Sequence, residues 1–465
     1  MPTREKVVEL AEVVRGEGGR ALLVGGCVRD SLLGIPFHEW DIEVFGVEPL
    51  RLREILEQFG RVDAVGEAFT VYKVGSDLDV SLPRRERKSG RGHRGFVIEG
   101  DPTLTIEEAT KRRDFTVNAI LQDPLTDEII DPYNGRADLE NKLLRAVSPE
   151  TFAEDSLRVL RAAQFAARFE FYIEPETVEL CRAIDLTDLA RERIWGEMEK
   201  LLLRARRPSI GFRWLHRFGT FDQLFPELKA LVGVPQEPEW HPEGTVDVHT
   251  WLTVDRAREL IDDLPRAKQL TVMLGALCHD FGKPATTEFT EGRIRSRGHE
   301  EGGVKPTEDF LDRLNVHTLD GYDVRAQTIA LVRDHLKPGA FYKKQDEVSD
   351  GAFRRLARRC ELELLYRVAK ADSLGRNADW IPREEWFTAE AQDWFITRAR
   401  ELNVQERPPE PLLMGRHLLE MGLKPGPRIG EITRALYEMQ LDGRVQTLED
   451  AKSVAQEMLE RDPRP

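Results

Sequence analysis

Residues 24–46, which read VGGCVRDSLLGIPFHEWDIEVFG, constrain the fold more than any other stretch of the chain. Behind a glycine pair, acids occupy every second position, at Glu39, Asp41 and Glu43, and apolar residues separate them. Such alternation is typical of a β-strand, on which residues two apart share one face. Three carboxylates on one face repel each other unless a cation lies between them. The pattern therefore favours a strand that carries a divalent metal site.

The residues around this strand add features of a phosphate site. Gly25 and Gly26 end an apolar strand, and residues 28–34 have the pattern of a following helix. Glycine lets the backbone approach a phosphate closely, and the free amides at a helix start favour an anion. Arg29 lies on the first turn, where its guanidinium can bind phosphate oxygens. A two-metal site also takes a carboxylate from a neighbouring strand, and Asp79 in SDLDVSLPRRE is the candidate.

A second pattern predicts nucleotide selection. In EDSLRVLR, Asp155, Arg158 and Arg161 lie three residues apart, on one face of a helix predicted over 151–169. Cytosine and adenine both present an amino donor beside a ring-nitrogen acceptor, and a carboxylate with a guanidinium complements that pair. Uracil and guanine present the opposite order. Asp155 and Arg158 can therefore select C or A without a template, the alternative being an ordinary helix ion pair between Glu154 and Arg158.

Histidines and acids form a third pattern in the second half of the chain. His279 and Asp280 are adjacent at the end of an apolar helical stretch, which directs both side chains into one cavity. Distant histidines and an aspartate can complete a ligand set for a divalent or transition metal, and such a site activates water for phosphoester hydrolysis. The alternative is a set of hydrogen-bonded core histidines. The other members are His249, His299, His335 and Asp372.

Composition limits the cellular context and the partners. The four cysteines lie far apart without a CxxC pair, which excludes a disulfide framework and fits a reducing, cytoplasmic compartment. No apolar run is long enough to cross a bilayer, and the first residues show no signal-peptide core, so we expect no membrane partner.

The net charge of −15 argues against wholesale nucleic-acid binding. The basic run 84–95, with Arg87, Lys88 and Arg91, can still follow a phosphate backbone locally.

The order of patterns predicts a multidomain α+β protein. Strands and helices alternate up to about residue 145, and the pattern is then almost wholly helical. Proline-rich stretches at 233–247 and 405–413 are interpreted as linkers. The last piece reads as two helices around a Pro-Gly turn that places Lys424 and Arg428 at a helix start, a candidate phosphate contact or a simple packing hairpin. The predicted domains are 1–146, 147–232, 245–385 and 405–465.

Five motifs in the first half occur in the order and spacing of a known family. They resemble the bacterial class II tRNA nucleotidyltransferase and poly(A) polymerase family, which belongs to the polymerase-β-like superfamily. The resemblance implies a head with a mixed sheet, followed by an all-helical body. The motifs are VGGCVRDSLLG…EWDIEVFG, KRRDFTVNAI, DPYNGRADL, EDSLRVLRAAQFAARF and RERIWGEMEKLL.

The resemblance also implies roles for individual residues. Gly26, Arg29 and Arg113 would bind the incoming nucleotide, and Glu39 with Asp41 would bind the metal pair, Mg²⁺. Asp79 would be the third carboxylate. Asp155 and Arg158 would select the base, and Arg161 would also contact the nucleotide. The basic segment 84–96 would be the family's flexible loop. The family usually has Asp where this chain has Glu39, so a pairing of Asp41 with Glu43 is the alternative, as is an inactive head.

Residues from about 245 to 380 resemble the HD-domain phosphohydrolase superfamily. By that resemblance His249, His279, Asp280 and Asp372 bind a divalent metal whose identity the sequence does not specify. His299 and His335 would hold a second ion or the substrate phosphate. The last predicted domain, 405–465, is similar to the C-terminal part of the nucleotidyltransferase family, which holds the tRNA elbow.

Together these resemblances imply transfer of CMP and AMP from CTP and ATP to the 3′ end of tRNA or another RNA. The HD domain would hydrolyse phosphate or cyclic phosphate esters at RNA ends. The alternatives are a poly(A) polymerase, an enzyme that adds only A or only CC, and an HD phosphohydrolase with an inactive RNA-binding head. A non-enzymatic tRNA-binding scaffold would require both metal sets to be coincidental.

Overall fold

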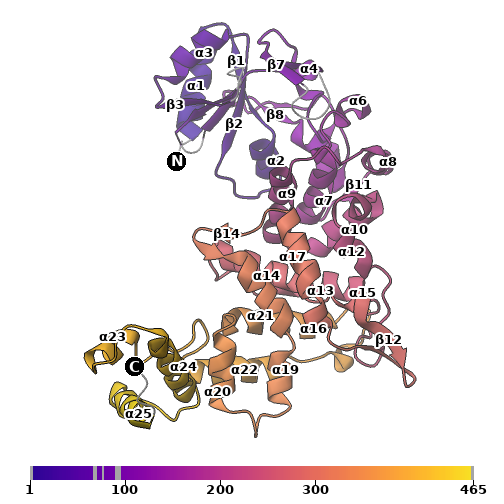
Figure 1. The fold of residues 1–465 in the computed structure, drawn as a ribbon. Helices are drawn as coiled ribbons and strands as arrows, with labels where there is room; N and C mark the ends of the chain where they lie inside the picture. Colours follow the sequence, from indigo (N-terminus) through magenta and orange to yellow (C-terminus); the bar gives the residue numbers. More distant parts are fainter. Residues whose placement is uncertain (1–3, 66–70, 76–77, 89–95, 462–465) are drawn as a thin grey trace. The chain divides into compact units, whose positions relative to one another are not determined.

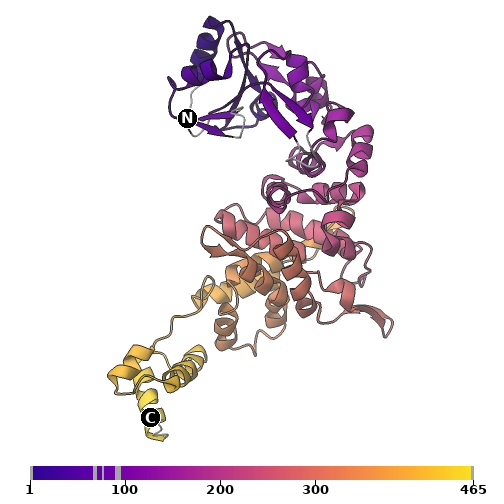
Figure 2. The same cartoon turned by 45° about the horizontal axis from the view of Figure 1, so that its top comes forward.

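The computed structural model describes residues 4–65, 71–75, 78–88 and 96–461. The chain divides into two compact units, Met1–Leu224 and Phe225–Pro465 (Figures 1 and 2).

A mixed sheet forms the centre of the first unit. Within the described residues seven strands pair in the order β3-β4-β5-β2-β1-β8-β9. The pair β2–β5 is parallel and the other pairs are antiparallel. A parallel pair needs a crossover connection, and residues 46–77 provide it through a helix and two strands. The strands are β1 (Arg20–Val24), β2 (Trp40–Phe45), β3 (Val62–Val65), β4 (Val71–Val74), β5 (Leu78–Ser81), β8 (Leu121–Gln122) and β9 (Ile129–Ile130).

Short helices and a hairpin surround this sheet. Helix α1 buries Val7, Leu10, Ala11 and Val14, spaced three and four apart, and packs on β1 and α3. The predicted helix after the glycine pair is confirmed as α2, and a turn at Gly75 separates the strands β4 and β5. The elements are α1 (Arg4–Gly16), α2 (Gly26–Leu32), α3 (Pro49–Leu56), the hairpin β6 (Arg84–Lys88) and β7 (Phe96–Gly100), α4 (Ile106–Thr110), the short 3-10 turn at Thr116–Asn118, and α5 (Gly135–Glu140).

Helices complete the first unit, but the single helix predicted over 151–169 is wrong. The chain leaves the helical path between α6 and α7, and Asp155 lies in this break. Its Oδ1 accepts a hydrogen bond from the amide of Leu157 at 3.2 Å, a local bond by which Asp competes with continuous helix. The elements are β10 (Leu143–Leu144), α6 (Pro149–Phe152), α7 (Leu157–Phe169), β11 (Tyr172–Ile173), α8 (Pro175–Ala183), α9 (Arg191–Arg204), α10 (Pro208–Phe218) and α11 (Thr220–Leu224).

The second unit is almost wholly helical. Helix α14, which contains the apolar run TVMLGALC, packs against α13, α18 and α21 and buries nearly every side chain. The helices are α12 (Pro226–Leu231), α13 (Val246–Arg258), α14 (Arg266–Cys278), α15 (Lys283–Thr286), α16 (His299–Gly302), α17 (Val304–Arg313), α18 (Val324–Asp334), α19 (Lys337–Tyr342), α20 (Asp350–Ala357), α21 (Leu362–Gly375), a short 3-10 turn at Arg383–Glu385, and α22 (Glu390–Glu401). Two small hairpins are β12 (Thr287–Thr290) with β13 (Arg293–Ser296), and β14 (Thr318–Leu319) with β15 (Tyr322–Asp323).

The end of this unit is a three-helix piece with a small apolar core of its own. Its helices are α23 (Gly415–Glu420), α24 (Pro427–Leu441) and α25 (Leu448–Arg461). The predicted turn before α24 is confirmed: Lys424 is exposed, and Arg428 lies on the first turn of the helix. Ion pairs join α24 and its C-terminal cap to α20 and its own C-terminal cap. Nη1 of Arg355 lies 2.6 Å from Oδ1 of Asp442, and Nη1 of Arg358 lies 2.5 Å from Oε1 of Glu438.

The expectations drawn from composition concerned the cysteines and the absence of membrane-spanning segments. The cysteines Cys27, Cys181, Cys278 and Cys360 are all free and buried. No helix among the described residues is both long and apolar enough to cross a membrane.

Candidate functional site

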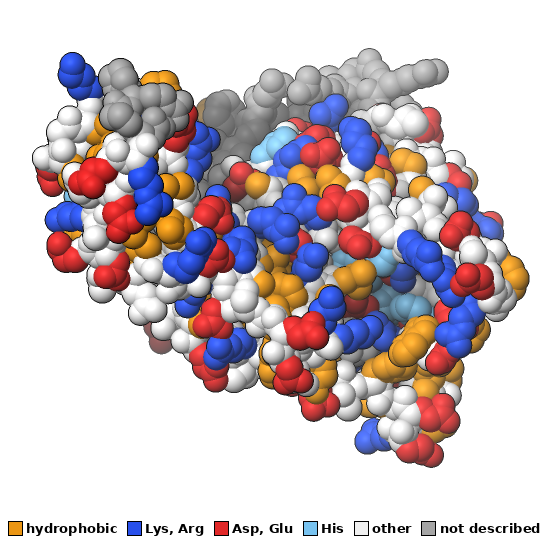
Figure 3. Space-filling view, turned by 60° about the horizontal axis from the view of Figure 1, so that its bottom comes forward, with side chains coloured by type: hydrophobic (Ala, Val, Ile, Leu, Met, Phe, Trp, Pro, Cys, Tyr) orange, Lys and Arg blue, Asp and Glu red, His pale blue; other side chains and the backbone are white. Residues whose placement is uncertain are grey.

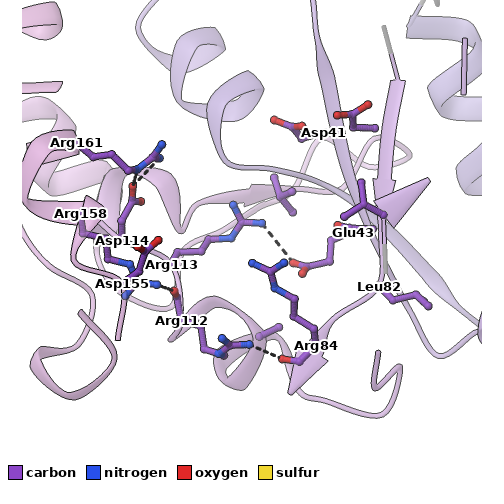
Figure 4. Close-up of a pocket in the computed structure, with 15 residues that line it drawn as sticks. Asp41, Glu43, Leu82, Arg84, Arg112, Arg113, Asp114, Asp155, Arg158 and Arg161 are labelled. Carbon is purple, nitrogen blue, oxygen red and sulfur yellow. Dashed lines mark hydrogen bonds and ion pairs between the residues drawn. The ribbon is translucent and has the colours of Figure 1, made fainter. Parts of the chain in front are cut away.

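The acidic end of a pocket in the first unit follows from strand register. Because β2 and β5 pair in parallel, Asp41 lies directly opposite Asp79. Both carboxylates line a cavity of about 410 Å³ (Figure 4). Lys73 stands opposite Asp79 on β4, and its Nζ lies 2.8 Å from Oδ2 of that carboxylate. The sheet thus brings together two acids that are far apart in the sequence.

The electrostatics at Asp41 fit a bound cation. Burial raises the pKa of this carboxyl to about 6, Asp79 and Glu39 add to the rise, and Arg113 opposes it. A divalent ion with oxygen ligands would relieve both the burial cost and the repulsion. The carboxylates of Glu39, Asp41 and Asp79 do not form a set whose ligand atoms all lie within 4.8 Å of one another.

The other acids of the alternating segment are placed differently. Glu43 shares β2 with Asp41 and is buried, and Nη2 of Arg113 lies 3.5 Å from its Oε2. Glu39 precedes the first residue of β2, is exposed and is not among the residues that line the pocket. Asp41 and Glu43 therefore share β2 as predicted, whereas Glu39 lies one residue before the strand and is still close enough to Asp41 to raise the pKa of that carboxyl.

Arginines line much of the same pocket. Figure 4 shows Arg113 and Arg84 beside Glu43 and Arg158 and Arg161 on the other side of the pocket, with Arg112 donating to the carbonyl oxygen of Arg84 at 2.9 Å. Gly25, at φ +68°, makes room for Arg113, because a Cβ there would lie 2.8 Å from Nη1 of that arginine. Such a group suits a polyphosphate. Its members are Arg84, Arg112, Arg113, Arg158 and Arg161.

Asp155 and Arg158 both line the pocket, and other groups hold each of them. Arg193 binds Asp155 with two hydrogen bonds, of 3.0 and 2.8 Å. Arg158 donates to the carbonyl oxygens of Thr151 and Arg112, each at 2.5 Å. Burial opposes ionisation of Asp155, but Arg193 outweighs it and lowers the pKa. Asp155 is therefore ionised and oriented before any ligand arrives.

Two residues of this region were missed at the level of sequence. Asp114 lines the pocket, and its Oδ2 accepts a hydrogen bond of 2.7 Å from Nε of Arg161. Burial opposes ionisation of Asp114, but Arg161 and a hydrogen bond from Asn118 together lower its pKa. The second is Arg193. Asp114 lies in the motif KRRDF and Arg193 in the motif RERIW, beside residues that were predicted to belong to the site, and this position could have indicated a role in the site.

Arg29 lies behind the pocket wall. Its side chain is 4% exposed, donates to Asp30 at 2.8 Å and stacks over Phe169. It is not among the residues that line the pocket, although its Nη2 is 3.7 Å from the position of a Cβ on Gly26. In the basic segment, Arg87 and Lys88 lie on β6 and Arg91 falls outside the described residues.

The second unit brings the predicted histidines and aspartates together. His249 lies near the start of α13, Asp372 lies on α21, and His279 directly follows α14. Their ligand atoms lie within 4.8 Å of one another, and Nε2 of His249 is 3.0 Å from Oδ1 of Asp372. Asp280 is adjacent, with its Oδ2 3.2 Å from Nε2 of His279.

A second set of candidate metal ligands contains Asp280, which also contacts His279 of the first set. It joins His299, at the start of α16, and His335, which caps α18. Nε2 of His299 lies 3.2 Å from Nε2 of His335 and 3.5 Å from Oδ1 of Asp280. On the face shown in Figure 3, histidine side chains lie in a hollow bordered by lysine and arginine side chains.

The ring nitrogens of three histidines are already assigned by their own turns. A carbonyl oxygen only accepts, so Nδ1 must donate and Nε2 is left as a ligand atom. The bonds are His279 Nδ1 to Ala276 O at 2.8 Å, His299 Nδ1 to Ser296 O at 2.7 Å, and His335 Nδ1 to Val332 O at 2.6 Å.

Unpartnered buried atoms test whether a metal fits here. Nε2 of His279 and Oδ1 of Asp280 are buried without a hydrogen-bond partner, which is costly unless an ion engages them. Burial, with the neighbouring His299 and His279, lowers the pKa of His335 to about 3, so this imidazole is neutral, as ligation requires. The residues fit a centre for one or two divalent ions.

The predicted linker contributes to this centre, which sequence reasoning missed. Glu243 is buried, and its Oε1 lies 2.7 Å from Nδ1 of His249 and 2.9 Å from Nδ1 of His241. Burial opposes protonation of His249, but Asp372 and Glu243 outweigh it and raise its pKa to about 8. The signal was a histidine and a glutamate flanking Pro242 in EWHPEG.

Gly282 supports the turn that carries Asp280. A Cβ at this position would lie 2.0 Å from the carbonyl oxygen of His299 and 2.6 Å from the amide nitrogen of Gly303. Gly282→Ala should therefore displace His299, weaken metal binding, and lower the free energy of unfolding by about 1–3 kcal/mol. Isothermal titration with Mn²⁺ and thermal unfolding measure both effects. Gly339→Ala, which meets no atom within 4 Å, is the control, and equal metal affinity of the two variants would contradict this account.

Comparison with known proteins follows the same division of the chain. Residues 21–145 match the model of the poly A polymerase head domain, and residues 170–231 match a probable RNA and SrmB-binding site of polymerase A. Residues 246–377 match the HD domain. Among solved structures, the Bacillus stearothermophilus CCA-adding enzyme in complex with CTP has a TM-score of 0.64 at 20% identity, covering 100% of this chain and 98% of that one. The expected fold class is confirmed.

Curated relatives match at higher identity. The multifunctional CCA protein of Stenotrophomonas maltophilia (strain R551-3) is 40% identical over 404 residues, which cover 82% of this chain and 93% of the relative. That of Haemophilus influenzae (strain PittGG) is 39% identical over 331 residues, which cover 66% of this chain and 77% of the relative. The chain therefore belongs to the family of multifunctional CCA proteins.

Proposed function

We propose that the chain adds C, C and A to the 3′ end of tRNA, using CTP and ATP at the pocket of the first unit. The observation that carries this proposal is the arrangement of that pocket. Paired carboxylates on β2 and β5 stand at one end, and the arginine-held Asp155 stands at the other. The curated relatives are named for CCA, and a similar fold is known for a Thermotoga maritima CCA-adding enzyme complexed with tRNA (TM-score 0.58, 19% identity, 97% of this chain and 94% of that one).

In the proposed reaction the 3′ oxygen of the RNA forms a bond to the α-phosphorus of the nucleotide, and the bond to pyrophosphate breaks. Asp41 and Asp79 would hold Mg²⁺, with Glu39 as a further carboxylate near Asp41. Bound Mg²⁺ would make the hydroxyl more acidic and neutralise the leaving pyrophosphate in a two-metal mechanism. Arg113 and its neighbours in the pocket would bind the triphosphate beside the glycine pair, with Arg29 behind Gly26.

Base selection would rest on Asp155 and Arg158. The carboxylate of Asp155 accepts from the amino group shared by cytosine and adenine, and Arg158 donates to the ring nitrogen beside it. Uracil and guanine would place a carbonyl against the carboxylate. Arg193 supports this role because it fixes Asp155 with two hydrogen bonds, and Arg161 would complete the nucleotide site from its bond to Asp114.

The HD centre supports a second proposed activity, hydrolysis of phosphate or cyclic phosphate esters at RNA ends before extension. His249, His279, Asp280 and Asp372 would hold one divalent ion, and Asp280 would share a second with His299 and His335. A bound ion would supply an activated water for attack on phosphorus. Lys283, whose Nζ lies 2.8 Å from Oδ2 of Asp280, keeps that carboxylate ionised.

We also propose the four-part division 1–146, 147–232, 245–385 and 405–465, which agrees in outline with the matched ranges 21–145, 170–231 and 246–377. Lys424 and Arg428 of the last part, and Arg87, Lys88 and Arg91 of the basic segment, are proposed RNA contacts. A cytoplasmic location fits the proposed substrates and the four free cysteines.

Single-nucleotide extension of tRNA that lacks CCA, with each nucleoside triphosphate alone and in pairs, tests the main proposal. We expect two C and one A, without U or G. Long A tails would identify a poly(A) polymerase instead, and addition of A alone or CC alone would identify a specialised enzyme. No addition with any nucleotide would favour a phosphohydrolase with an inactive head.

Loss of the two hydrogen bonds from Arg193 to Asp155 should lower the enzyme's selectivity among nucleotides. In Arg193→Met, Asp155 loses both hydrogen bonds that orient it, so the preference for CTP over UTP should fall by about 10- to 100-fold. The ratio of kcat/KM values for the two nucleotides measures this preference. Arg191→Met, an exposed arginine on the same helix, is the matched control. An unchanged ratio in Arg193→Met would count against the role of Asp155.

A further inference from the structure

Glu243 occupies an unusual position beside the HD centre. Its side chain is 0% exposed, and one oxygen, Oε1, lies within 3 Å of two imidazoles, those of His249 and His241. Within the described residues no lysine or arginine forms an ion pair with it. A buried carboxylate without such a partner is costly unless another positive charge lies nearby.

The contact determines which nitrogen of His249 can bind a metal. Nδ1 of His249 lies 2.7 Å from Oε1 of Glu243, and since an ionised carboxylate only accepts, this charge contact favours the form of His249 that carries a proton on Nδ1. Nε2, on the opposite side of the ring, lies 3.0 Å from Oδ1 of Asp372 and 4.0 Å from Oδ2 of Asp280, and it is the nitrogen that would exchange its contact with Asp372 for the ion. Glu243, His249 and the proposed ion thus stand in one line of contacts.

This arrangement distinguishes His249 from the other histidines of the centre. Those three donate Nδ1 to a backbone carbonyl of their own turn. His249 alone uses a side chain, and that side chain bears a charge. A carboxylate in this position makes an imidazole a stronger donor to a metal and fixes its orientation.

We propose that Glu243 is a positioning residue of the HD metal centre, which sets the tautomer and orientation of His249 and compensates charge for the bound ion. His241 holds the same carboxylate oxygen from the other side, through a contact of 2.9 Å, and keeps Glu243 in place. This inference rests on the proposed metal centre and extends it into the segment 233–247.

Binding of Co²⁺ to the full chain, followed by visible absorption, tests the inference without reference to activity. Glu243→Leu removes the acceptor and should weaken Co²⁺ binding at the HD centre about 10- to 100-fold and shift the absorption band. Glu243→Gln keeps an acceptor oxygen but loses the charge, so its affinity should lie between wild type and Glu243→Leu. Glu239→Gln, the same change at a half-exposed residue four positions away, should bind as wild type. His279→Ala identifies the part of the signal that belongs to this centre.

The outcomes separate the inference from the function on which it rests. Wild-type affinity and an unshifted band in both Glu243 variants, with the signal lost in His279→Ala, would overturn the role of Glu243 and leave the metal centre standing. A signal that His279→Ala does not change would overturn the metal centre itself. Thermal unfolding of the same preparations shows whether the second unit, which contains Glu243, is folded, and Glu243→Gln keeps the test decisive if Glu243→Leu does not fold.

Discussion

Asp41→Asn should abolish nucleotide addition, with a loss of kcat/KM on the order of a thousandfold or more. Asp41 is the acid on which the head site depends most, because it faces Asp79 across the parallel strands and also feels the charge of Glu39. Asparagine keeps the size of the side chain but removes the negative charge that attracts Mg²⁺. Extension of tRNA lacking CCA, with CTP and increasing Mg²⁺, measures the loss.

Glu39→Gln is the informative comparison for this prediction. Glu39 precedes β2, is exposed and does not line the pocket, so we expect a loss of about tenfold or less. Hydrolysis by the HD centre should be unchanged in both variants. A loss in Glu39→Gln as large as in Asp41→Asn would instead make Glu39 a metal ligand of equal weight.

His279→Ala should abolish hydrolysis of phosphate esters while nucleotide addition continues. Its Nε2 is buried without a hydrogen-bond partner at the point where the two ligand sets meet, so removing it takes a donor from the centre of the site. We expect a loss of hydrolysis on the order of a thousandfold. Release of phosphate from a 2′,3′-cyclic nucleotide and from a phosphomonoester, with each added metal, provides the measurement.

The control for this prediction is His317→Ala, an exposed histidine of the same unit outside both ligand sets. It should hydrolyse as wild type does. Retention of hydrolysis in His279→Ala at every metal concentration would exclude the HD centre as the site of that reaction.

Much of the architecture follows from local pattern. Strands β2 and β5, the helix after the glycine pair and the convergence of His249, His279 and Asp372 were all predictable, because periodicity and motif order are properties of the sequence. Asp79 was predictable as the acid of a neighbouring strand. Its register with Asp41 depends on pairing across residues 46–77, which periodicity does not specify.

The errors arose where tertiary partners decide the local structure. At the break in the helix predicted over 151–169, the local bond from the Leu157 amide to Asp155 is joined by bonds from Arg193 to Asp155 and from Ser156 to Asp188, whose partners lie far along the chain. The role of Glu243 was hidden for the same reason. A proline-rich segment has the composition of a linker whether or not it packs beside a metal centre, and the contact of Glu243 with His249 depends on the position of α13.

The three histidines that donate to a carbonyl three residues earlier have a consequence for mutational robustness. Backbone carbonyls persist under any substitution, so random mutation of neighbouring side chains cannot remove the groups that orient His279, His299 and His335. His249 lacks this protection, since within the described residues its ring nitrogens contact only replaceable side chains, those of Glu243, Asp372 and Thr253 among them. The orientation of His249 should therefore be the most sensitive of the four to substitution of neighbouring side chains.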